Sequence, residues 1–141
     1  MDNVEIVRRL EEGYAKDDLS VVDEIIADNF IAHAPGAELM PPGREGPRMA
    51  HTGAMQSFPD HVTTVEDIFG EDDKVVVHVR MKGTNQGGVP WAGIPANGKP
   101  IDIDWVTIYR LEDGKVVETW AQMDIPTLMQ QLGAMPGPGG M

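Results

Sequence analysis

The fold is decided by the stretch Tyr109-Arg-Leu-Glu-Asp-Gly-Lys115, in which an Asp-Gly pair separates two β-rich segments. Asp-Gly between alternating apolar residues is a strong signal for a tight hairpin turn. The flanking segments are residues 101–110 and 116–123, and residues 62–69 and 74–82 have the same character. The sequence therefore predicts one curved antiparallel sheet.

Alternation along these strands predicts which face of the sheet is buried. One face carries mostly apolar side chains at odd-numbered positions: Val75, Val77, Val79, Met81, Ile101, Ile103, Trp105, Thr107 and Tyr109. The same parity in the last strand places Val117, Thr119, Ala121 and Met123 inside and Trp120 outside. A bulge in that strand would reverse its faces.

Helical periodicity dominates the first part of the chain. Apolar residues recur at helical spacing over residues 4–14, a second helix follows from Ser20 as its N-cap, and a third starts near Pro47. Residues 30–34 are predicted to form a short strand or an extended arm. The Pro- and Gly-rich residues 35–46 form a loop that is suited to act as a pocket lid. Helices packed on one face of an antiparallel sheet make an α+β domain.

Composition limits the partners. The chain has 141 residues, enough for one compact domain, and a formal net charge of −12, which disfavours nucleic acid or an anionic membrane as partner. It has no cysteine, so thiolate chemistry and cysteine-ligated metal sites are excluded.

Without a long apolar run or a secretion signal, we expect a cytoplasmic protein. We assign residues 1–133 to one domain and residues 134–141 to a disordered Pro/Gly-rich tail.

Four motifs in order carry a family resemblance. They are Gly83-Thr-Asn-Gln-Gly, Trp91-Ala-Gly-Ile-Pro-Ala-Asn-Gly-Lys-Pro100, the hairpin stretch, and Trp120-Ala-Gln-Met-Asp124 followed by Gln130-Gln-Leu-Gly133. This set resembles the SnoaL-like polyketide cyclase family over about residues 3–133. The resemblance implies the nuclear transport factor 2-like cone, in which a bent sheet wraps around three helices and leaves a hydrophobic pocket. It also implies a homodimer through the outer face of the sheet, where Trp120 would lie.

The resemblance further implies a reaction. Characterised SnoaL-like cyclases close a ring by an intramolecular aldol reaction, without metal or organic cofactor, and use an aspartate and a histidine on neighbouring strands. Those two positions fall on Ala121 and Thr107 here, and neither residue carries a proton near neutral pH. Two hypotheses follow: a cofactor-independent cyclase or isomerase that uses other residues, or a binding protein that kept the pocket and lost the acid/base pair.

Three residues are candidate catalytic groups. His33 lies on the extended arm and is the first candidate for a general base. His51 shares a helix face with Met55 and Phe58, and core packing is its alternative role. Asp124 ends the Trp120 motif, but it is also a good N-cap for the closing helix, which would lower its pKa. His61 and His78 are expected to be solvated.

The remaining pocket candidates suit a small hydrophobic or aromatic ligand: Tyr14, Phe30, Met49, Met55, Trp91, Trp105, Thr107, Ala121 and Met123. Asp102 and Asp104 share one strand face, but that face points away from the pocket and no histidine joins them at ligand spacing. We therefore expect no metal site. Water activation for epoxide opening is disfavoured, because it requires an inward arginine that the parity does not provide.

Overall fold

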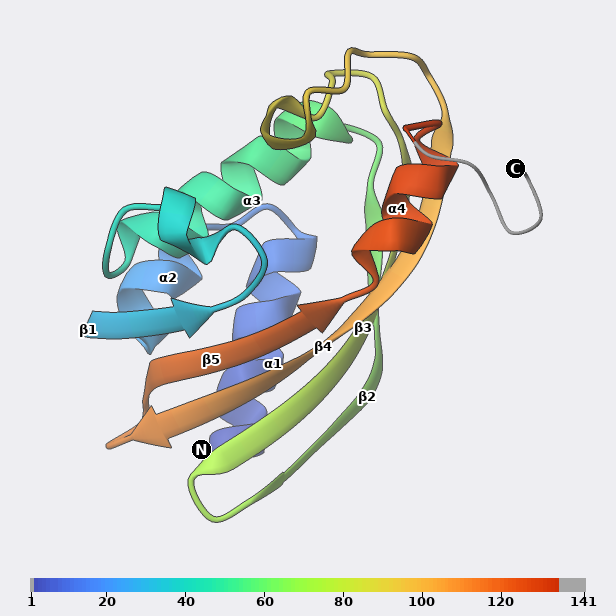
Figure 1. The fold of residues 1–141 in the computed structure, drawn as a ribbon. Coiled ribbons are helices and arrows are strands. Elements are labelled where there is room, and N and C mark those ends of the chain that lie inside the picture. The colour runs from blue at the N-terminus through green and yellow to red at the C-terminus, as the bar shows by residue number, and fades with distance from the viewer. Residues whose placement is uncertain (1, 135–141) are drawn as a thin grey trace.

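The sheet of this protein has five strands, and helices cover one of its faces (Figure 1). The structure, a computed structural model, describes residues 2–134. The elements are α1 (Asn3–Ala15), α2 (Ser20–Ile25), β1 (Ile26–His33), η1 (Ala37–Leu39), α3 (Glu45–Ser57), β2 (Val62–Glu71), β3 (Lys74–Thr84), η2 (Pro90–Ala92), β4 (Pro100–Glu112), β5 (Lys115–Met123) and α4 (Ile125–Gln131). The predicted α+β class with a curved sheet is confirmed. Of the expected tail, residues 135–141 lie outside the described residues.

The strand order is β1-β5-β4-β3-β2. Strands β2 to β5 pair antiparallel, as predicted, whereas β1 pairs with β5 in parallel. The sheet is thus mixed at one edge, because the long loop and α3 separate β1 from the meander of the other four strands.

The helix boundaries follow local capping, with two corrections. Asp2 caps α1 by accepting a hydrogen bond from the Glu5 backbone N–H at 2.9 Å. The prediction that Ser20 is the N-cap of α2 is wrong, because Ser20 is the first residue of this helix. The Ser20 hydroxyl donates a hydrogen bond to the Asp18 carboxylate at 2.6 Å. Helix α3 begins at Glu45, so Pro47 lies within the first turn, where its missing N–H costs no hydrogen bond.

The predicted strand faces are confirmed in β3 and β4, where the odd-numbered residues point inward. The pairing of β4 with β5 contains a register shift between Arg110 and Leu111 of β4. Arg110 pairs with Glu118, whereas Leu111 pairs with Val116, so Val117 of β5 is the extra residue of a bulge. Beyond this bulge the predicted parity holds, because Tyr109 pairs with Thr119.

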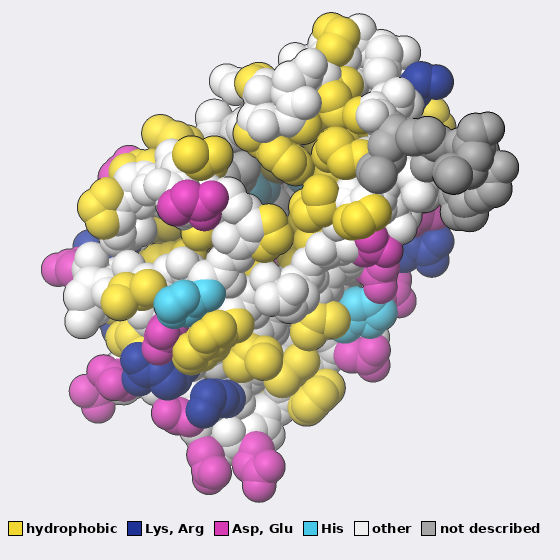
Figure 2. Space-filling model, viewed as in Figure 1, with side chains coloured by type: hydrophobic (Ala, Val, Ile, Leu, Met, Phe, Trp, Pro, Cys, Tyr) yellow, Lys and Arg dark blue, Asp and Glu magenta, His cyan; other side chains and the backbone are white. Residues whose placement is uncertain are grey.

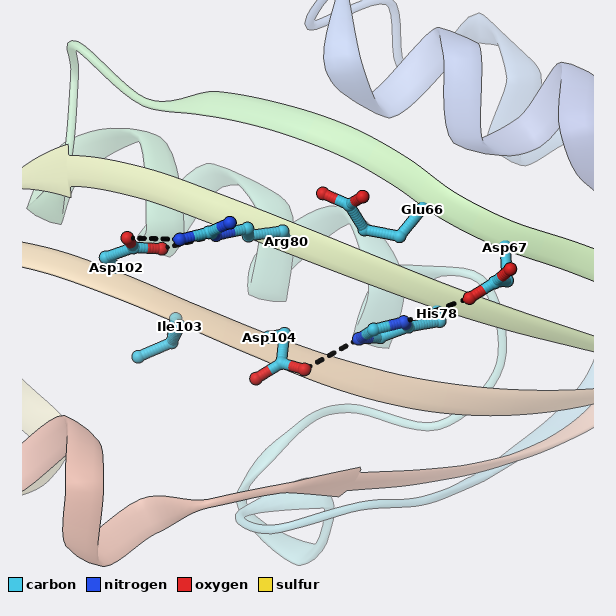
Figure 3. Close-up of a pocket in the computed structure, with 7 residues that line it drawn as sticks. All are labelled: Glu66, Asp67, His78, Arg80, Asp102, Ile103 and Asp104. Atoms are coloured by element: carbon cyan, nitrogen blue, oxygen red, sulfur yellow. Dashed lines mark hydrogen bonds and ion pairs between the residues drawn. The ribbon is translucent and has the colours of Figure 1, made fainter.

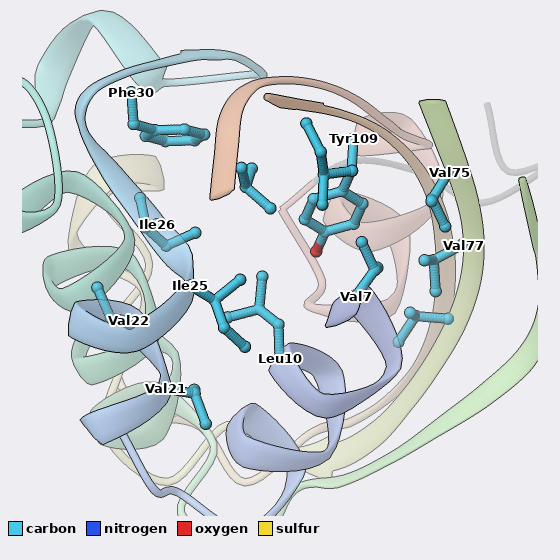
Figure 4. Close-up of a cluster of buried hydrophobic side chains, with 13 residues drawn as sticks. Val7, Leu10, Val21, Val22, Ile25, Ile26, Phe30, Val75, Val77 and Tyr109 are labelled. Atoms are coloured by element: carbon cyan, nitrogen blue, oxygen red, sulfur yellow. The ribbon is translucent and has the colours of Figure 1, made fainter. Parts of the chain in front are cut away.

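The concave side of the sheet holds two hydrophobic clusters. The first lies between α1, α2 and the sheet (Figure 4), and the second lies under α4 and the loop after β3. The partly buried Trp105 packs against both clusters. No helix within residues 2–134 combines the length and apolar character that a membrane crossing requires.

Candidate active site

Five polar side chains lie between α1, α3 and the concave face of the sheet, and a sixth, that of Asp17, lies at their rim and is 40% exposed. We call them the interior polar track: Glu11, Tyr14, Asp17, His51, His61 and Tyr109. Helix α1 supplies Glu11 and Tyr14, which are three residues apart and therefore lie on the same helix face. Asp17 follows directly after this helix, and the two histidines approach from α3 and from the start of β2.

The deep end of the track is a buried carboxyl group. Glu11 and Tyr109 are each only 6% exposed, and the Tyr109 hydroxyl donates a hydrogen bond to Glu11 Oε1. Burial raises the pKa of Glu11, and the bond from Tyr109 opposes this only in part. A buried carboxyl held by one hydroxyl is costly for stability, and such groups concentrate at functional sites.

Tyr14 lies one helical turn after Glu11 and packs against a histidine. The rings of Tyr14 and His51 are stacked, with centroids 5.4 Å apart and an angle of 25° between the planes. Burial and the nearby Glu11 charge raise the pKa of Tyr14, which keeps its hydroxyl protonated as a hydrogen-bond donor. Within residues 2–134 this hydroxyl makes no hydrogen bond of its own. A ligand oxygen beside it would therefore find a free donor.

The other end of the track is a carboxylate shared by two imidazoles. Asp17 Oδ1 lies 3.0 Å from His51 Nε2 and 3.1 Å from His61 Nε2. The side chains of His51 and His61 are 11% and 7% exposed. The prediction that His61 is solvated is therefore wrong. The second ring nitrogen of His61 lies 3.4 Å from the Thr63 hydroxyl, whereas that of His51 has no partner within the part of the chain described.

The face of the molecule drawn in Figure 2 is hollowed at one place. Figure 2 shows a hollow between α4 and the segment after β1, bordered by hydrophobic side chains, with a histidine visible in its depth. His33 and His78 both lie on the outer face of the sheet.

The two positions expected from the resemblance lie beside the track. Thr107 and Ala121 are directly paired across β4 and β5, on the inner face of the sheet. Thr107 is two residues from Tyr109 on the same face of β4. These two expected positions thus share a sheet face with Tyr109, although neither Thr107 nor Ala121 can carry the proton.

His33 does not enter the interior, which corrects the expectation from the sequence. Its Nε2 lies 2.7 Å from Glu118 Oε2, and its ring stacks on Trp120 with centroids 5.5 Å apart. The register explains this position, because β1 aligns His33 with Trp120, an outward residue of β5. The His33 hydrogen bond and Arg110 lower the pKa of Glu118. A catalytic role for His33 stays a prediction that its location does not favour.

Asp124 takes the alternative role considered for it. Its carboxylate accepts hydrogen bonds from the Thr127 backbone N–H at 3.1 Å and from the Thr127 hydroxyl at 2.7 Å. Asp124 is thus the N-cap of α4, and these bonds lower its pKa. A carboxylate stabilised in this way is a weak base near neutral pH.

The predicted ligand-binding residues divide into three groups. Tyr14, Met55, Trp105, Thr107, Ala121 and Met123 are half-buried or buried on the concave side. Phe30 is a core residue of the first hydrophobic cluster, and its contact with a ligand stays a prediction. Met49 and Trp91 are 52% and 57% exposed, so they lie at the surface, and their contact with a ligand stays a prediction.

A second hollow, of about 420 Å³, lies on the outer face of the sheet (Figure 3). Its walls are Glu66, Asp67, His78, Arg80, Asp102, Ile103 and Asp104. Arg80 forms two hydrogen bonds of 2.7 Å with Asp102, and His78 lies between Asp104 and Asp67. These bonds, that of Asp104 first, raise the pKa of His78. The basic groups are already paired with carboxylates, as in ordinary surface ion-pair networks.

Sequence reasoning missed Glu11, Asp17 and Tyr109 as site residues. Glu11 was detectable, because it follows Val7 by one turn on the apolar face of α1 and a lone charge there is unusual. Asp17 carried no such signal, since its role depends on a left-handed backbone conformation with φ of 59°. Among residues 2–134 no group of three His, Asp or Glu side chains has the geometry to hold a metal ion.

Comparison with protein families gives one clear match. The model described as SnoaL-like polyketide cyclase matches residues 4–132. A curated relative, an orotidine 5'-phosphate decarboxylase of Sordaria macrospora, is 37% identical over 57 residues, which are 40% of this chain and 14% of that protein. The chain thus spans about a seventh of that relative.

Solved structures resemble nearly the whole chain. TsrD of Streptomyces laurentii is 28% identical, with a TM-score of 0.82 over 96% of this chain and 99% of that one. IdmH of Streptomyces antibioticus, described as a candidate polyketide cyclase, is 30% identical, with a TM-score of 0.78 over 94% and 99%. A SnoaL-like candidate cyclase of Jannaschia is 27% identical, with a TM-score of 0.80 over 95% and 93%.

Proposed function

The chain belongs to the SnoaL-like polyketide cyclase family, and we propose that it is a cofactor-independent enzyme acting on a small hydrophobic carbonyl compound. The family and the structural relatives support a function of cyclase or isomerase type. The proposed reaction is an intramolecular aldol condensation, or a related isomerisation that moves a proton next to a carbonyl group. His51 is the proposed general base and Tyr14 the proposed donor to the enolate.

The observation that carries this proposal is the stacked pair of Tyr14 and His51. The pair offers a protonated hydroxyl and a ring nitrogen, both without a partner among residues 2–134. Removal of a proton next to a carbonyl requires a base at the carbon and a donor at the oxygen. The two rings supply one group of each kind at adjacent positions.

The proposed step conserves atoms and charge. The C–H bond next to the carbonyl breaks, its proton passes to Nδ1 of His51, and its electron pair moves onto the carbonyl oxygen. The enolate oxygen accepts a hydrogen bond from the Tyr14 hydroxyl. The enolate carbon then attacks a second carbonyl of the same molecule, and the new alkoxide takes the proton back from His51.

A binding protein without catalysis is the second candidate. Thr107 and Ala121 favour it, because the positions expected to hold the acid/base pair are paired as expected yet carry no titratable group. Such a protein would bind flat hydrophobic ligands in the same hollow and would leave their C–H bonds intact.

The two candidates differ in solvent exchange of the ligand. We would incubate the protein in D₂O with a panel of flat aromatic β-keto esters and follow deuterium incorporation next to the ketone by NMR. The wild type is expected to accelerate exchange of at least one compound. His51→Gln should lower that rate by about 10²-fold or more, the usual range for loss of a general base, and Tyr14→Phe should also lower it.

His78→Gln is the matched control, because it removes a histidine from the outer face of the sheet and should leave the rate unchanged. A wild type that binds the esters without exchange would favour the binding protein. Loss of exchange in His33→Gln but not in His51→Gln would assign the base to the other histidine and overturn the proposal.

A further inference from the structure

We propose that Asp17 is a positioning residue that fixes the ring orientation and tautomer of His51. This inference rests on the proposed function for its catalytic meaning, but the structural part can be tested without any substrate. Neither the sequence pattern nor the family resemblance assigned a role to Asp17.

Hydrogen-bond chemistry determines which nitrogen of His51 carries the hydrogen. An ionised carboxylate only accepts hydrogen bonds, so His51 Nε2, 3.0 Å from Asp17 Oδ1, must carry a hydrogen. In the neutral imidazole the other nitrogen, Nδ1, then holds the free lone pair. This is the nitrogen without a partner in the described chain, so the Asp17 contact selects the tautomer that a general base needs.

The groups around His51 fix the orientation of its ring. The ring of His51 is stacked on Tyr14 at 5.4 Å and meets the ring of His61 edge-on at 6.0 Å. His61 Nε2 donates to the same oxygen of Asp17, at 3.1 Å. Asp17 thereby joins the end of α1 to α3 and to the start of β2, and the His51 ring is held on two sides as well as at Nε2.

The backbone of Asp17 has a conformation that glycine would adopt at lower cost. Its φ of 59° lies in the left-handed region, where glycine is favoured and where aspartate and asparagine are the tolerated exceptions. Glycine at the end of α1 would satisfy the turn without this strain. An aspartate here carries a local cost, and the contact with two nearly buried histidines is an interaction that glycine could not provide.

The backbone also supplies a sharp experiment. Asp17→Gly removes the carboxylate and relieves the left-handed strain. Because glycine adopts this backbone conformation readily, a loss of function in this variant would not result from disruption of the turn. Asp17→Asn tolerates the same backbone and keeps an oxygen that accepts from Nε2. Asp113→Gly is the matched control, because Asp113 is also a left-handed aspartate, with φ of 50°, in the β4–β5 turn.

The first readout is the tautomer of His51, from the two imidazole ¹⁵N shifts of the ligand-free protein above the titration range of histidine. The wild type and Asp113→Gly should show a hydrogen on Nε2 and none on Nδ1. Asp17→Gly should show a mixture of tautomers, and Asp17→Asn should retain most of the wild-type form. A hydrogen on Nδ1 of His51 in the wild type, or unchanged shifts in Asp17→Gly, would overturn the proposal.

The second readout is deuterium exchange of the β-keto ester. Misplacement of a reacting group by about 1 Å can cost about 10²-fold, so Asp17→Gly should lower kcat by up to that factor with little change in KM. Asp17→Asn should recover most of this loss. If the tautomer changes as expected while even the wild type exchanges no ester proton, Asp17 still positions His51 and only the proposed function fails.

Discussion

At the scale of single residues, Glu11 is the most unusual group in the protein. The residue is 6% exposed among the apolar residues of α1 and the sheet, and its carboxyl has Tyr109 as hydrogen-bond partner. Its pKa in the folded protein is raised above the ordinary value of 4.5 by burial. Folding therefore favours the protonated form of this group.

This shift predicts how stability depends on pH. A raised pKa contributes stability that is fully present below the unfolded-state value and is lost as pH rises through the folded-state value. We expect Glu11→Gln to become more stable relative to the wild type as pH rises above 4.5, by about 1.4 kcal/mol for each unit of pKa shift. Urea unfolding between about pH 5 and pH 8 measures the difference. Glu12→Gln, on the exposed side of α1, is the control and should show no such trend; equal pH dependence of wild type and Glu11→Gln would refute the prediction.

At the scale of elements, α4 depends on its first residue. Asp124 accepts two hydrogen bonds from Thr127 and carries a lowered pKa because of them. Asp124→Ala should lower Tm by about 2–8 °C, the usual effect of losing an N-cap, while Asp124→Asn should lose much less. The pKa of Asp124 is lower in the folded protein than in the unfolded chain. The stabilisation by the cap is therefore present at pH values above the ordinary pKa of aspartate, and it is lost as pH falls through the folded-state pKa. Thermal unfolding followed by circular dichroism tests this, and a wild-type Tm in Asp124→Ala would show that the cap is unimportant.

The loop between β3 and β4 depends on one buried amide. Asn85 is fully buried, accepts from the Gly88 N–H at 2.8 Å, and donates to the Pro95 carbonyl at 3.0 Å and to Asn97 Oδ1 at 3.1 Å. Asn85→Ala leaves these groups without partners, so we expect a loss of roughly 2–4 kcal/mol in the free energy of unfolding. Gln86→Ala, at the exposed neighbour, should change it by less than about 0.5 kcal/mol. Urea denaturation compares the two, and similar losses would show that Asn85 is not the residue that holds this loop.

Elements with a regular period were predictable from the sequence. The apolar spacing of α1 and the alternation of β3 and β4 depend on local geometry, so residue order alone defines them. The exceptions come from contacts between distant segments. The parallel pairing of β1 with β5 sends His33 outward, and the bulge after Arg110 buries both Val116 and Val117.

At the scale of the whole molecule, the site was less predictable than the fold. His51 is brought beside Tyr14 by packing of α3 on α1, which helical periodicity made plausible. The contacts of Asp17 with His51 and His61 span 34 and 44 residues of sequence, and no local pattern specifies them. The family resemblance did not predict the contacts of Asp17 either, because the positions that it implies for the acid/base pair are Thr107 and Ala121.

The outer face of the sheet is the expected interface between two copies of the chain. Ile31 and Val106 are 56% and 40% exposed there, beside the partly buried Trp120, and Figure 2 shows hydrophobic side chains gathered over β4 and β5. Exposed apolar patches of this kind mark interaction surfaces.

We expect light scattering after size-exclusion chromatography to give twice the mass of one chain. Val106→Glu should give single chains at the same concentration, because a carboxylate would be buried unpaired in the interface. Leu39→Glu, which removes an equally apolar but more exposed side chain from η1, should remain dimeric; a wild type that is monomeric at every concentration tested would rule out this interface.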